Sequence, residues 1–395
     1  MISRYLTTRN DSSYLILGPR QTGKTSFVKA KFPTAWNINL LLTSEYLKYS
    51  KDPGLFRKEA LFRFHGRPKD QIGMTVIIDE IQKVPALLDE VHALIEELPG
   101  SQFILTGSSA RKLKRNAVNL LAGRALSKRM YPFIFPEISS LAHLDLNELL
   151  QFGTLPGVFE KETDLKREIL RTYVDTYLKE EIQTEGLTRS LAQFSHFLDV
   201  AAQSFTEVLN LSKIGRSCGQ SPKTTQNYFE ILEDTLIGFR LMSWSESKRS
   251  QLASHPKFYF FDNGVTCALL SRLLDPLDPS LRGKLFEQWL INEVRARVDY
   301  DARDIQLFSW RTQVENAEVD LLAARAKTPL FAAEIKSFNK PSPEHFRNLR
   351  ILRKDYPKLP LYLICTADHA YRDDLDDSIT VIPWAKFLLE ELPKY

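Results

Sequence analysis

The chain has 395 residues, of which 43% are hydrophobic and 26% are charged. These fractions lie near the averages of globular domains and exclude a wholly disordered or fibrous protein. At roughly 100–200 residues per domain, this length predicts two or three domains, each large enough to bury its own core.

Membrane-spanning and disulfide-stabilised classes are not expected either. No stretch approaches the roughly 18 consecutive apolar residues of a membrane span, and polar residues 9–11 interrupt the apolar start that a signal peptide would need. Cys218, Cys267 and Cys365 stand apart, which predicts buried reduced thiols rather than a disulfide or a zinc site. We therefore expect a soluble, cytoplasmic protein with no membrane partner.

The distribution of charge is more informative than its sum. The net charge is +4, from 53 basic and 49 acidic residues, which is too small to identify a polyanionic partner. Between residues 107 and 132 every charged residue is basic, namely Arg111, Lys112, Lys114, Arg115, Arg124, Lys128 and Arg129. This local excess can hold the phosphate of a nucleotide or a nucleic acid, and it fits a solvated helix face equally well.

Strands and helices alternate in the first part of the chain. Apolar runs at residues 14–17, 75–78 and 102–105 predict buried strands, and apolar residues at helical spacing over residues 84–98 predict a helix between the last two. Strand, helix and strand in this order predict a parallel sheet with right-handed crossovers. We expect an α/β domain over residues 1–143.

A phosphate-binding loop follows the first predicted strand. Residues 18–25, GPRQTGKT, fit the pattern GxxxxGK[ST] and lead into a predicted helix over residues 26–31. Backbone N–H groups around Gly23 can surround phosphate oxygens, Lys24 can reach the β- and γ-phosphates, and the Thr25 hydroxyl can bind Mg²⁺. We expect ATP and Mg²⁺ at Gly18, Pro19, Arg20, Gln21, Thr22, Gly23, Lys24, Thr25 and Ser26.

An acidic pair follows the second predicted strand. Asp79 can hold Mg²⁺ at the end of the strand, and Glu80 can orient the attacking water as a general base. Taken alone, the pair could instead cap the following helix. Beside a phosphate-binding loop, it favours ATP hydrolysis.

The ordered motifs GPRQTGKT, IIDEIQ, LTGSS, LAGR and GTLPGV resemble a prokaryotic AAA+ family whose C-terminal part is a domain of unknown function related to nuclease folds. The resemblance spans nearly the full chain. It implies that Thr106 or Ser108 senses the γ-phosphate, although either residue fits a simple turn. It also implies that Arg124 completes the site of a neighbouring subunit in a homo-oligomer such as a hexameric ring; a structural ion pair is the alternative for Arg124.

Helices dominate the next segment, for which we expect a second domain over residues 144–250, a helical lid and a winged helix-turn-helix. The pattern predicts helices at 162–185, 194–205, 211–218 and 222–236, with Ser221 as the N-cap of the last, and a strand at 239–244. DNA-reading helices place base-contacting groups at their exposed start, which here carries Lys223, Thr224, Gln226 and Asn227. Winged helices also serve as protein contacts or ATPase lids, and Glu230, Glu233 and Asp234 make the later turns acidic.

A second α/β unit is expected over residues 251–395. The pattern predicts helices at 283–298 and 344–353 and strands at 307–310, 318–323, 330–335 and 361–365. Glu287 on the first helix, Asp320 on one strand and Glu334 with Lys336 on the next resemble the PD-(D/E)xK nuclease superfamily. The resemblance implies Mg²⁺ held by Glu287, Asp320 and Glu334, with Lys336 positioning water.

Two alternatives stay open for this segment. E-x-K is a common tripeptide, and domains of this fold also serve as non-catalytic binding modules. Glu315 and Glu318 fit surface positions at a strand edge equally well.

Together these features predict an Mg²⁺-dependent AAA+ ATPase that couples ATP turnover to the binding or remodelling of DNA, as a motor or a branch-migration protein. Its expected partners are ATP or ADP, duplex or branched DNA, and further copies of itself. The alternatives are a nucleotide-gated protein-binding switch and an ATP-controlled metal-dependent nuclease.

Overall fold

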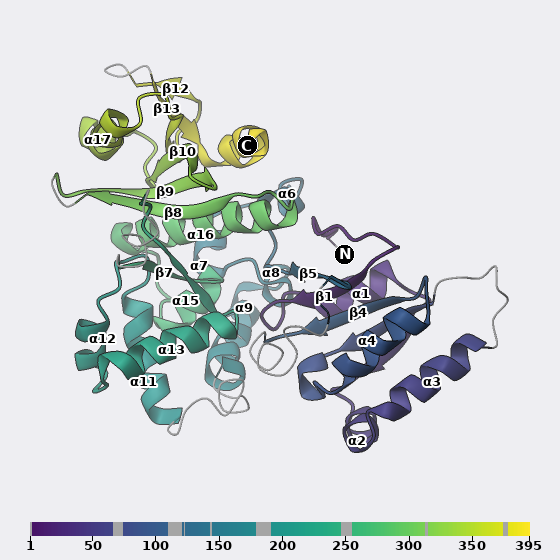
Figure 1. Ribbon diagram of the computed structural model, residues 1–395. Helices are drawn as coiled ribbons and strands as arrows, with labels where there is room; N and C mark the ends of the chain where they lie inside the picture. Colours follow the sequence, from purple (N-terminus) through teal and green to yellow (C-terminus); the bar gives the residue numbers. More distant parts are fainter. Residues whose placement is uncertain are drawn as a thin grey trace. The chain divides into compact units, whose positions relative to one another are not determined.

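The computed structural model describes residues 2–65, 74–109, 121, 123–142, 144–178, 191–245, 255–312, 315–373 and 378–395. They form an N-terminal unit, Arg4–Pro132 with Asp234–Leu236, and a C-terminal unit, Met1–Ser3, Phe133–Glu233 and Ile237–Tyr395 (Figure 1). Residues from the second and third expected domains both lie in the C-terminal unit. The expected boundaries at residues 143 and 250 lie outside the described residues, so the three-domain division stays a prediction.

A five-stranded parallel sheet forms the centre of the N-terminal unit, in the order β2-β3-β4-β1-β5. Its strands are β1 (Ser13–Leu17), β2 (Trp36–Asn39), β3 (Thr75–Asp79), β4 (Gln102–Gly107) and β5 (Ala125–Arg129). The predicted strands and the parallel sheet are confirmed. Strands β2 and β5 were not predicted. Strand β5 carries exposed charged residues instead of an apolar run.

Right-handed crossovers place the helices of this unit on both faces of the sheet. The helices are α1 (Lys24–Lys31), α2 (Thr43–Lys51), α3 (Gly54–His65) and α4 (Leu87–Glu97), with a short 3₁₀ turn, η1 (Ile81–Lys83). The step from β1 to β2 crosses the sheet in one direction, and the steps from β2 to β3 and β3 to β4 run back. Therefore α1 covers one face, and α3 packs beside α4 on the other (Figure 1).

The first part of the C-terminal unit is mainly helical. Its elements are α6 (Phe135–Ile138), α7 (Leu146–Phe152), α8 (Pro156–Phe159), α9 (Thr163–Thr172), η2 (Tyr173–Leu178), α11 (Leu191–Gln203), α12 (Leu211–Ser217), α13 (Pro222–Asp234), the antiparallel strands β6 (Gly238–Leu241) and β7 (Lys257–Phe260), and α15 (Asn263–Leu269). The N-cap at Ser221 is confirmed, since its hydroxyl oxygen accepts from the Thr224 N–H at 3.1 Å. The predicted helix over 162–185 is present to residue 178, and its remainder lies outside the described residues.

A six-stranded mixed sheet follows, in the order β12-β13-β11-β10-β9-β8. Its elements are α16 (Pro279–Tyr300), β8 (Gln306–Thr312), β9 (Ala317–Arg325), β10 (Thr328–Ile335), η3 (Pro343–Phe346), α17 (Arg347–Asp355), β11 (Leu361–Cys365), β12 (Tyr371–Arg372), β13 (Ile379–Pro383), α18 (Trp384–Lys386), η4 (Phe387–Glu391) and η5 (Leu392–Lys394). Strands β8, β9 and β10 are antiparallel neighbours, whereas β10, β11 and β13 are parallel.

Alternating side chains of β9 build two cores, one on each face of this sheet. Leu321 and Ala323 pack with α16 in the larger core, and Leu322 and Ala324 pack in the other, which includes residues of α17. The helix carrying Glu287 therefore covers one face, and the basic helix α17 covers the opposite face.

The motif GTLPGV at residues 153–158 has a structural explanation within this unit. A Cβ at Gly153 would lie 2.2 Å from Asp262 Oδ1. The Asp262 carboxylate accepts from the Thr154 N–H at 2.9 Å and caps α15 through the Val265 N–H at 3.1 Å. The glycine is required because the capping carboxylate approaches its backbone.

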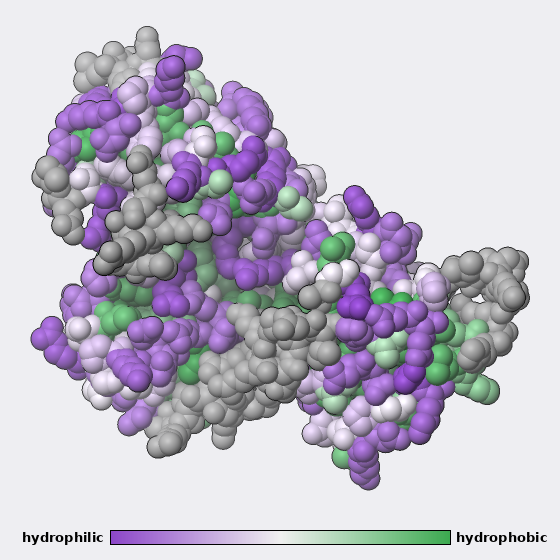
Figure 2. All heavy atoms as spheres, in the orientation of Figure 1, coloured by the Kyte–Doolittle hydropathy of each residue, from purple (hydrophilic) through white to green (hydrophobic). Residues whose placement is uncertain are grey.

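Two further expectations concern the cysteines and membrane-spanning helices. Cys218, Cys267 and Cys365 are buried and carry no disulfide, as predicted. Among the described helices none is long and apolar enough to cross a membrane. The face drawn in Figure 2 is largely hydrophilic, with small separate hydrophobic patches.

A buried carboxyl group holds the start of α6 against α16. Glu293 is 4% exposed, and its Oε2 accepts from the Phe135 N–H at 2.8 Å. Burial, together with the nearby Glu137 charge, raises the pKa of Glu293 from 4.5 to about 8 despite this hydrogen bond and the nearby Arg297. The folded protein therefore binds this proton more tightly than the unfolded chain does.

We predict that the free energy of unfolding of the wild type falls, relative to that of Glu293→Gln, as pH rises from about 4.5 to 8. The unfolded carboxyl ionises in this window while the folded one stays protonated, and glutamine keeps a neutral acceptor. The difference should reach on the order of 5 kcal/mol, since each pKa unit corresponds to about 1.4 kcal/mol. Urea unfolding at several pH values measures it. The exposed Glu160→Gln control should follow wild type, and a pH-independent gap between wild type and Glu293→Gln would contradict the assignment.

Candidate nucleotide-binding site

The loop between β1 and α1 depends on two glycines. A Cβ at Gly18 would lie 2.3 Å from the Met130 carbonyl oxygen, so no larger residue fits there. Gly23 has φ 86°, a left-handed conformation that side chains rarely adopt. This turn allows the chain to enter α1 with the backbone N–H groups of its first turn directed at the loop, as phosphate binding requires.

Lys24 and Thr22 hold the loop in shape. Lys24 is 5% exposed, and its Nζ donates to the carbonyl oxygens of Gly18 at 2.7 Å and Pro19 at 2.9 Å. The Thr22 hydroxyl donates to the Pro19 oxygen at 2.8 Å. The ammonium group thus lies within the loop.

Arg4 contacts this loop from the start of the chain, a role that no sequence motif indicated. Its guanidinium donates to the Thr22 carbonyl oxygen at 2.7 Å and to the Tyr131 carbonyl oxygen at 2.7 Å. It therefore fastens the phosphate loop to the segment after β5. A lone arginine near the start of the chain gave no signal from which this role could be predicted.

The expected metal ligands Thr25 and Asp79 are in direct contact. The Thr25 hydroxyl donates to Asp79 Oδ2 at 2.8 Å, and the Thr106 hydroxyl donates to Asp79 Oδ1. Asp79 is 1% exposed at the end of β3. A carboxylate and a hydroxyl beside a phosphate loop are the oxygen ligands that Mg²⁺ prefers, so these residues could hold that ion.

Glu80 is held by two neighbouring polar side chains. It has φ 62°, and its N–H donates to Thr106 Oγ1 at 3.3 Å. The Gln82 amide donates to the Glu80 carboxylate and, at 3.0 Å, to Ser108 Oγ, while Ser108 Oγ lies 3.4 Å from Glu80 Oε2. Gln82 belongs to the motif IIDEIQ. Its contacts with Glu80 and Ser108 could not be predicted, since they depend on β3 and β4 being neighbours.

Two further expectations concern the loop and the arginine. Pro19, Arg20, Gln21 and Ser26 lie in the turn and the first turn of α1, as expected. Arg124 forms an ion pair with Glu96 on α4, which is the geometry of the structural alternative; its role in a neighbouring subunit stays a prediction. The basic residues at 111–115 and Ala122 of the LAGR motif lie outside the described residues.

The C-terminal unit brings its four predicted residues together. Glu287 lies on α16, Asp320 on β9, and Glu334 and Lys336 at the end of β10. The Lys336 ammonium lies 2.9 Å from Glu334 Oε1 and 3.4 Å from Asp320 Oδ2. Within the described residues, no group of three or more His, Cys, Asp or Glu side chains is arranged to hold a metal ion.

A second lysine, Lys257 of β7, enters this cluster. Its Nζ lies 3.0 Å from Glu287 Oε1, 3.2 Å from Asp320 Oδ1 and 2.6 Å from Glu318 Oε1. Tyr259, two residues along the same strand, donates its hydroxyl to Glu287 Oε1 at 2.7 Å. Neither residue was predicted, because they lie in a separate part of the chain with no motif.

Burial and charge shift the pKa values of this cluster in opposite directions. Burial raises the pKa of Asp320, but Lys336, Lys257 and the Ile335 N–H outweigh it and lower the pKa to about 2. Burial and the Asp320 charge raise the pKa of Glu334 to about 8. Burial lowers the pKa of Lys257, but the surrounding acidic groups raise it well above its usual range. Asp320 is therefore the carboxylate that stays ionised between the two lysines.

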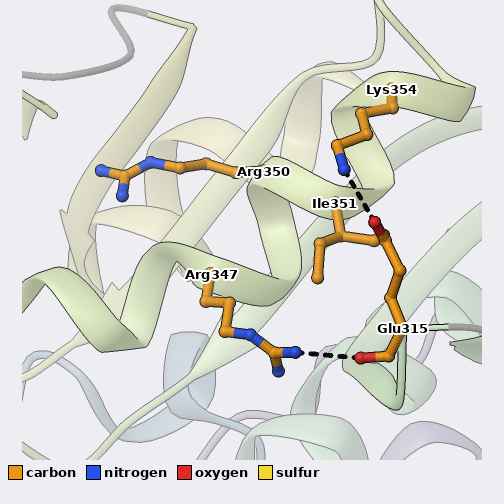
Figure 3. A pocket seen from close by; sticks show the side chains of 5 residues that line it. All are labelled: Glu315, Arg347, Arg350, Ile351 and Lys354. Carbon is orange, nitrogen blue, oxygen red and sulfur yellow. Dashed lines mark hydrogen bonds and ion pairs between the residues drawn. The ribbon is translucent and has the colours of Figure 1, made fainter.

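A basic groove lies on α17, away from this cluster. It has a volume of about 470 Å³ and is lined by Glu315, Arg347, Arg350, Ile351 and Lys354 (Figure 3). The Arg347 guanidinium donates to the Glu315 carbonyl oxygen at 2.9 Å, and the Lys354 ammonium donates to the Glu315 carboxylate at 2.8 Å. Glu315 thus contacts two of the three basic residues, and Arg350 is paired with Asp373 instead.

Similarity to known families covers nearly the whole chain in three parts. Residues 10–139 match an AAA domain, residues 143–275 match a domain of unknown function (DUF8612), and residues 282–387 match another domain of unknown function (DUF4143).

Individual relatives are distant. An uncharacterized protein of Haemophilus influenzae is 22% identical over 80% of this chain and 78% of its own length. Another from Methanocaldococcus jannaschii is 22% identical over 80% of this chain and 74% of its own length. A Walker-type ATPase of Pyrococcus abyssi superposes with a TM-score of 0.43 at 17% identity, covering 65% of this chain and 90% of that one.

The AAA match and the geometry of the loop agree. The N-terminal unit is a P-loop ATPase domain of the AAA type: it contains the phosphate loop, the acidic pair and, between them, the buried strand β4 with Thr106 near its end. The protein is an ATPase.

We predict that Gln82→Leu lowers kcat for ATP roughly tenfold and leaves KM nearly unchanged. Leucine keeps the volume of the side chain but cannot donate to Glu80, so the base loses its orientation while the phosphate loop is untouched. Steady-state ATP hydrolysis measures both constants. The exposed Gln306→Leu serves as the matched control and should behave as wild type. An unchanged kcat in Gln82→Leu would show that Glu80 is oriented by other groups.

Proposed function

We propose that this protein hydrolyses ATP with Mg²⁺ and couples the cycle to the binding or remodelling of DNA. The observation that carries hydrolysis is the contact of Thr25 with Asp79 beside a Glu80 that is already held by Gln82 and Ser108. In this proposal Thr25 and Asp79 hold the metal ion, and the neighbouring Glu80 is the base.

Each residue then has a distinct task. The backbone of residues 18–25 binds the phosphates, Lys24 contacts the β- and γ-phosphates, and Glu80 accepts a proton from the attacking water. Mg²⁺ held near Thr25 and Asp79 would neutralise phosphate charge. Thr106 and Ser108, which contact Asp79 and Glu80 respectively, would report the γ-phosphate to the acidic pair. Arg124 would complete the site of an adjacent copy in a homo-oligomer.

Support for DNA comes from the C-terminal unit. Helices α12 and α13, joined by a short turn and followed by β6 and β7, have the order of a winged helix-turn-helix. Exposed basic side chains lie on α12 and at the start of α13; they are Lys213, Arg216 and Lys223. The basic groove on α17 adds further positive charge, and both surfaces suit contacts to phosphate rather than to base edges.

The protein-binding switch is the second candidate, and the chemistry of α13 favours it. Beyond its first turn the helix carries Glu230 and Glu233, of which Glu230 accepts from Gln226 at 3.0 Å and Glu233 is paired with Arg240. Acidic residues here would repel a DNA backbone along the length of the helix. A switch predicts slow ATP turnover that no DNA alters.

The first test is ATP turnover with and without duplex, branched and single-stranded DNA. We expect at least one form to stimulate turnover several-fold. Glu80→Gln should lower kcat by 10²-fold or more but keep ATP affinity, since a general base contributes roughly 10²–10⁴ to the rate. Lys24→Ala should lose ATP binding itself. Turnover that ignores every DNA would reject the DNA coupling and leave the ATPase assignment standing.

A second test examines the basic groove. We predict that Arg347→Ala with Lys354→Ala weakens DNA binding about tenfold in low salt and lowers the slope of log affinity against log salt by about two, since each phosphate contact contributes about 0.9 to that slope. Fluorescence anisotropy over a salt series measures both. Lys386→Ala with Lys394→Ala removes the same charge from exposed ion-paired positions. If the two double variants bind alike, the groove is not a DNA contact.

A further inference from the structure

The C-terminal cluster has the residues of a nuclease-like metal centre but not its cation position. Mg²⁺ in such a centre needs oxygen ligands at about 2.0–2.1 Å in near-octahedral geometry and keeps several waters. In this protein the space between Glu287 and Asp320 holds the Lys257 ammonium, 3.0 Å from one carboxylate and 3.2 Å from the other. The residues that would bind a metal are already bound to a cation of the chain itself.

The geometry of Lys257 matches what an ammonium group requires. A lysine head has three N–H donors and no acceptor. Three carboxylates lie within 3.2 Å of this Nζ, from Glu287, Asp320 and Glu318. All three donors therefore have an anionic partner, although the residue is only 4% exposed. A charge buried this deeply is tolerated because it is paired with three carboxylates and donates hydrogen bonds to those of Glu287 and Asp320.

Strand pairing on both edges of β7 fixes the backbone at Lys257. Lys257 pairs with Leu241 of β6 and forms a bridge with Val208 on its other side. The next residue, Phe258, is fully buried, and its carbonyl oxygen accepts from the Thr206 N–H at 2.8 Å. Because side chains alternate along a strand, Lys257 and Tyr259 both face Glu287 while Phe258 anchors the opposite face.

A divalent ion would meet strong repulsion in this position. It would lie within a few ångströms of the Lys257 charge. A second positive charge is also near, because the Lys336 ammonium lies 3.4 Å from Asp320 Oδ2. The fit between the donor set and Mg²⁺ therefore fails, although all four predicted residues are present.

We propose that Lys257 is a built-in cation that replaces the divalent metal of this centre. The cluster then binds no Mg²⁺, and it joins the β6–β7 pair to α16 and to the C-terminal sheet through charge. This inference goes beyond the ATPase function and is independent of DNA coupling. It removes the metal centre on which an ATP-controlled nuclease would depend.

The test asks whether removal of Lys257 creates a metal site. All proteins carry Asp79→Asn, which removes the metal ligand of the nucleotide site, and Mn²⁺ without nucleotide is the probe. Titration calorimetry and the electron paramagnetic resonance of free Mn²⁺ give the stoichiometry. The protein that retains Lys257 should bind no Mn²⁺ at this centre. Lys257→Ala should bind about one Mn²⁺ per chain and gain several degrees in Tm when it is added.

Matched variants distinguish this result from nonspecific binding. Asp320→Asn added to Lys257→Ala should abolish the new site. Lys284→Ala, which removes an ion pair with Glu207 from the same helix α16, should gain no Mn²⁺. Where Lys257→Ala does not fold, Lys257→Met keeps most of the length of the side chain without its charge and is measured in the same way. Asp320-dependent Mn²⁺ binding in the protein that retains Lys257, or a folded Lys257 variant that gains none, would overturn the proposal.

Discussion

The position of β4 between β1 and β3 is the constraint on which the nucleotide site depends. The phosphate loop follows β1 and the acidic pair follows β3, and these strands are separated by one strand. Residues after β4 therefore lie between the two motifs. Thr106 reaches the Asp79 carboxylate and Ser108 reaches the Glu80 carboxylate because of this strand order. A sheet in which β1 and β3 were direct neighbours would leave no backbone from which a third polar group could contact both.

Much of this arrangement could be predicted, since it depends on local patterns. The strands before Gly18 and before Asp79 are short apolar runs bounded by a glycine or by acidic residues, and the helix from Pro222 has a proline and a capping serine at its start. In these cases the residues that form the element also lie next to each other in the chain. The loop between β1 and α1 could be predicted for the same reason: its motif is contiguous, and it needs only one strand and one helix.

The residues that sequence reasoning missed act across long distances in the chain. Arg4 contacts carbonyl oxygens at residues 22 and 131, and Lys257 contacts carboxylates at 287, 318 and 320. A carbonyl oxygen has no sequence signature, and a lone lysine in an aromatic strand fits a solvated position as well as a buried one. Such roles depend on strand order and register, which one sequence without its fold does not provide.

The two acidic centres differ in how their carboxylates are satisfied, and this difference separates their chemistry. At the nucleotide site, hydroxyl groups of Thr25 and Thr106 donate to Asp79. These donors are neutral and leave the negative charge available to a cation. At the C-terminal centre, Asp320 is bound by two ammonium groups, which compensate its charge before any ion arrives. Similar carboxylates on neighbouring strands can thus form a metal site or a closed ion-pair cluster, and the charge of the donors beside them decides which.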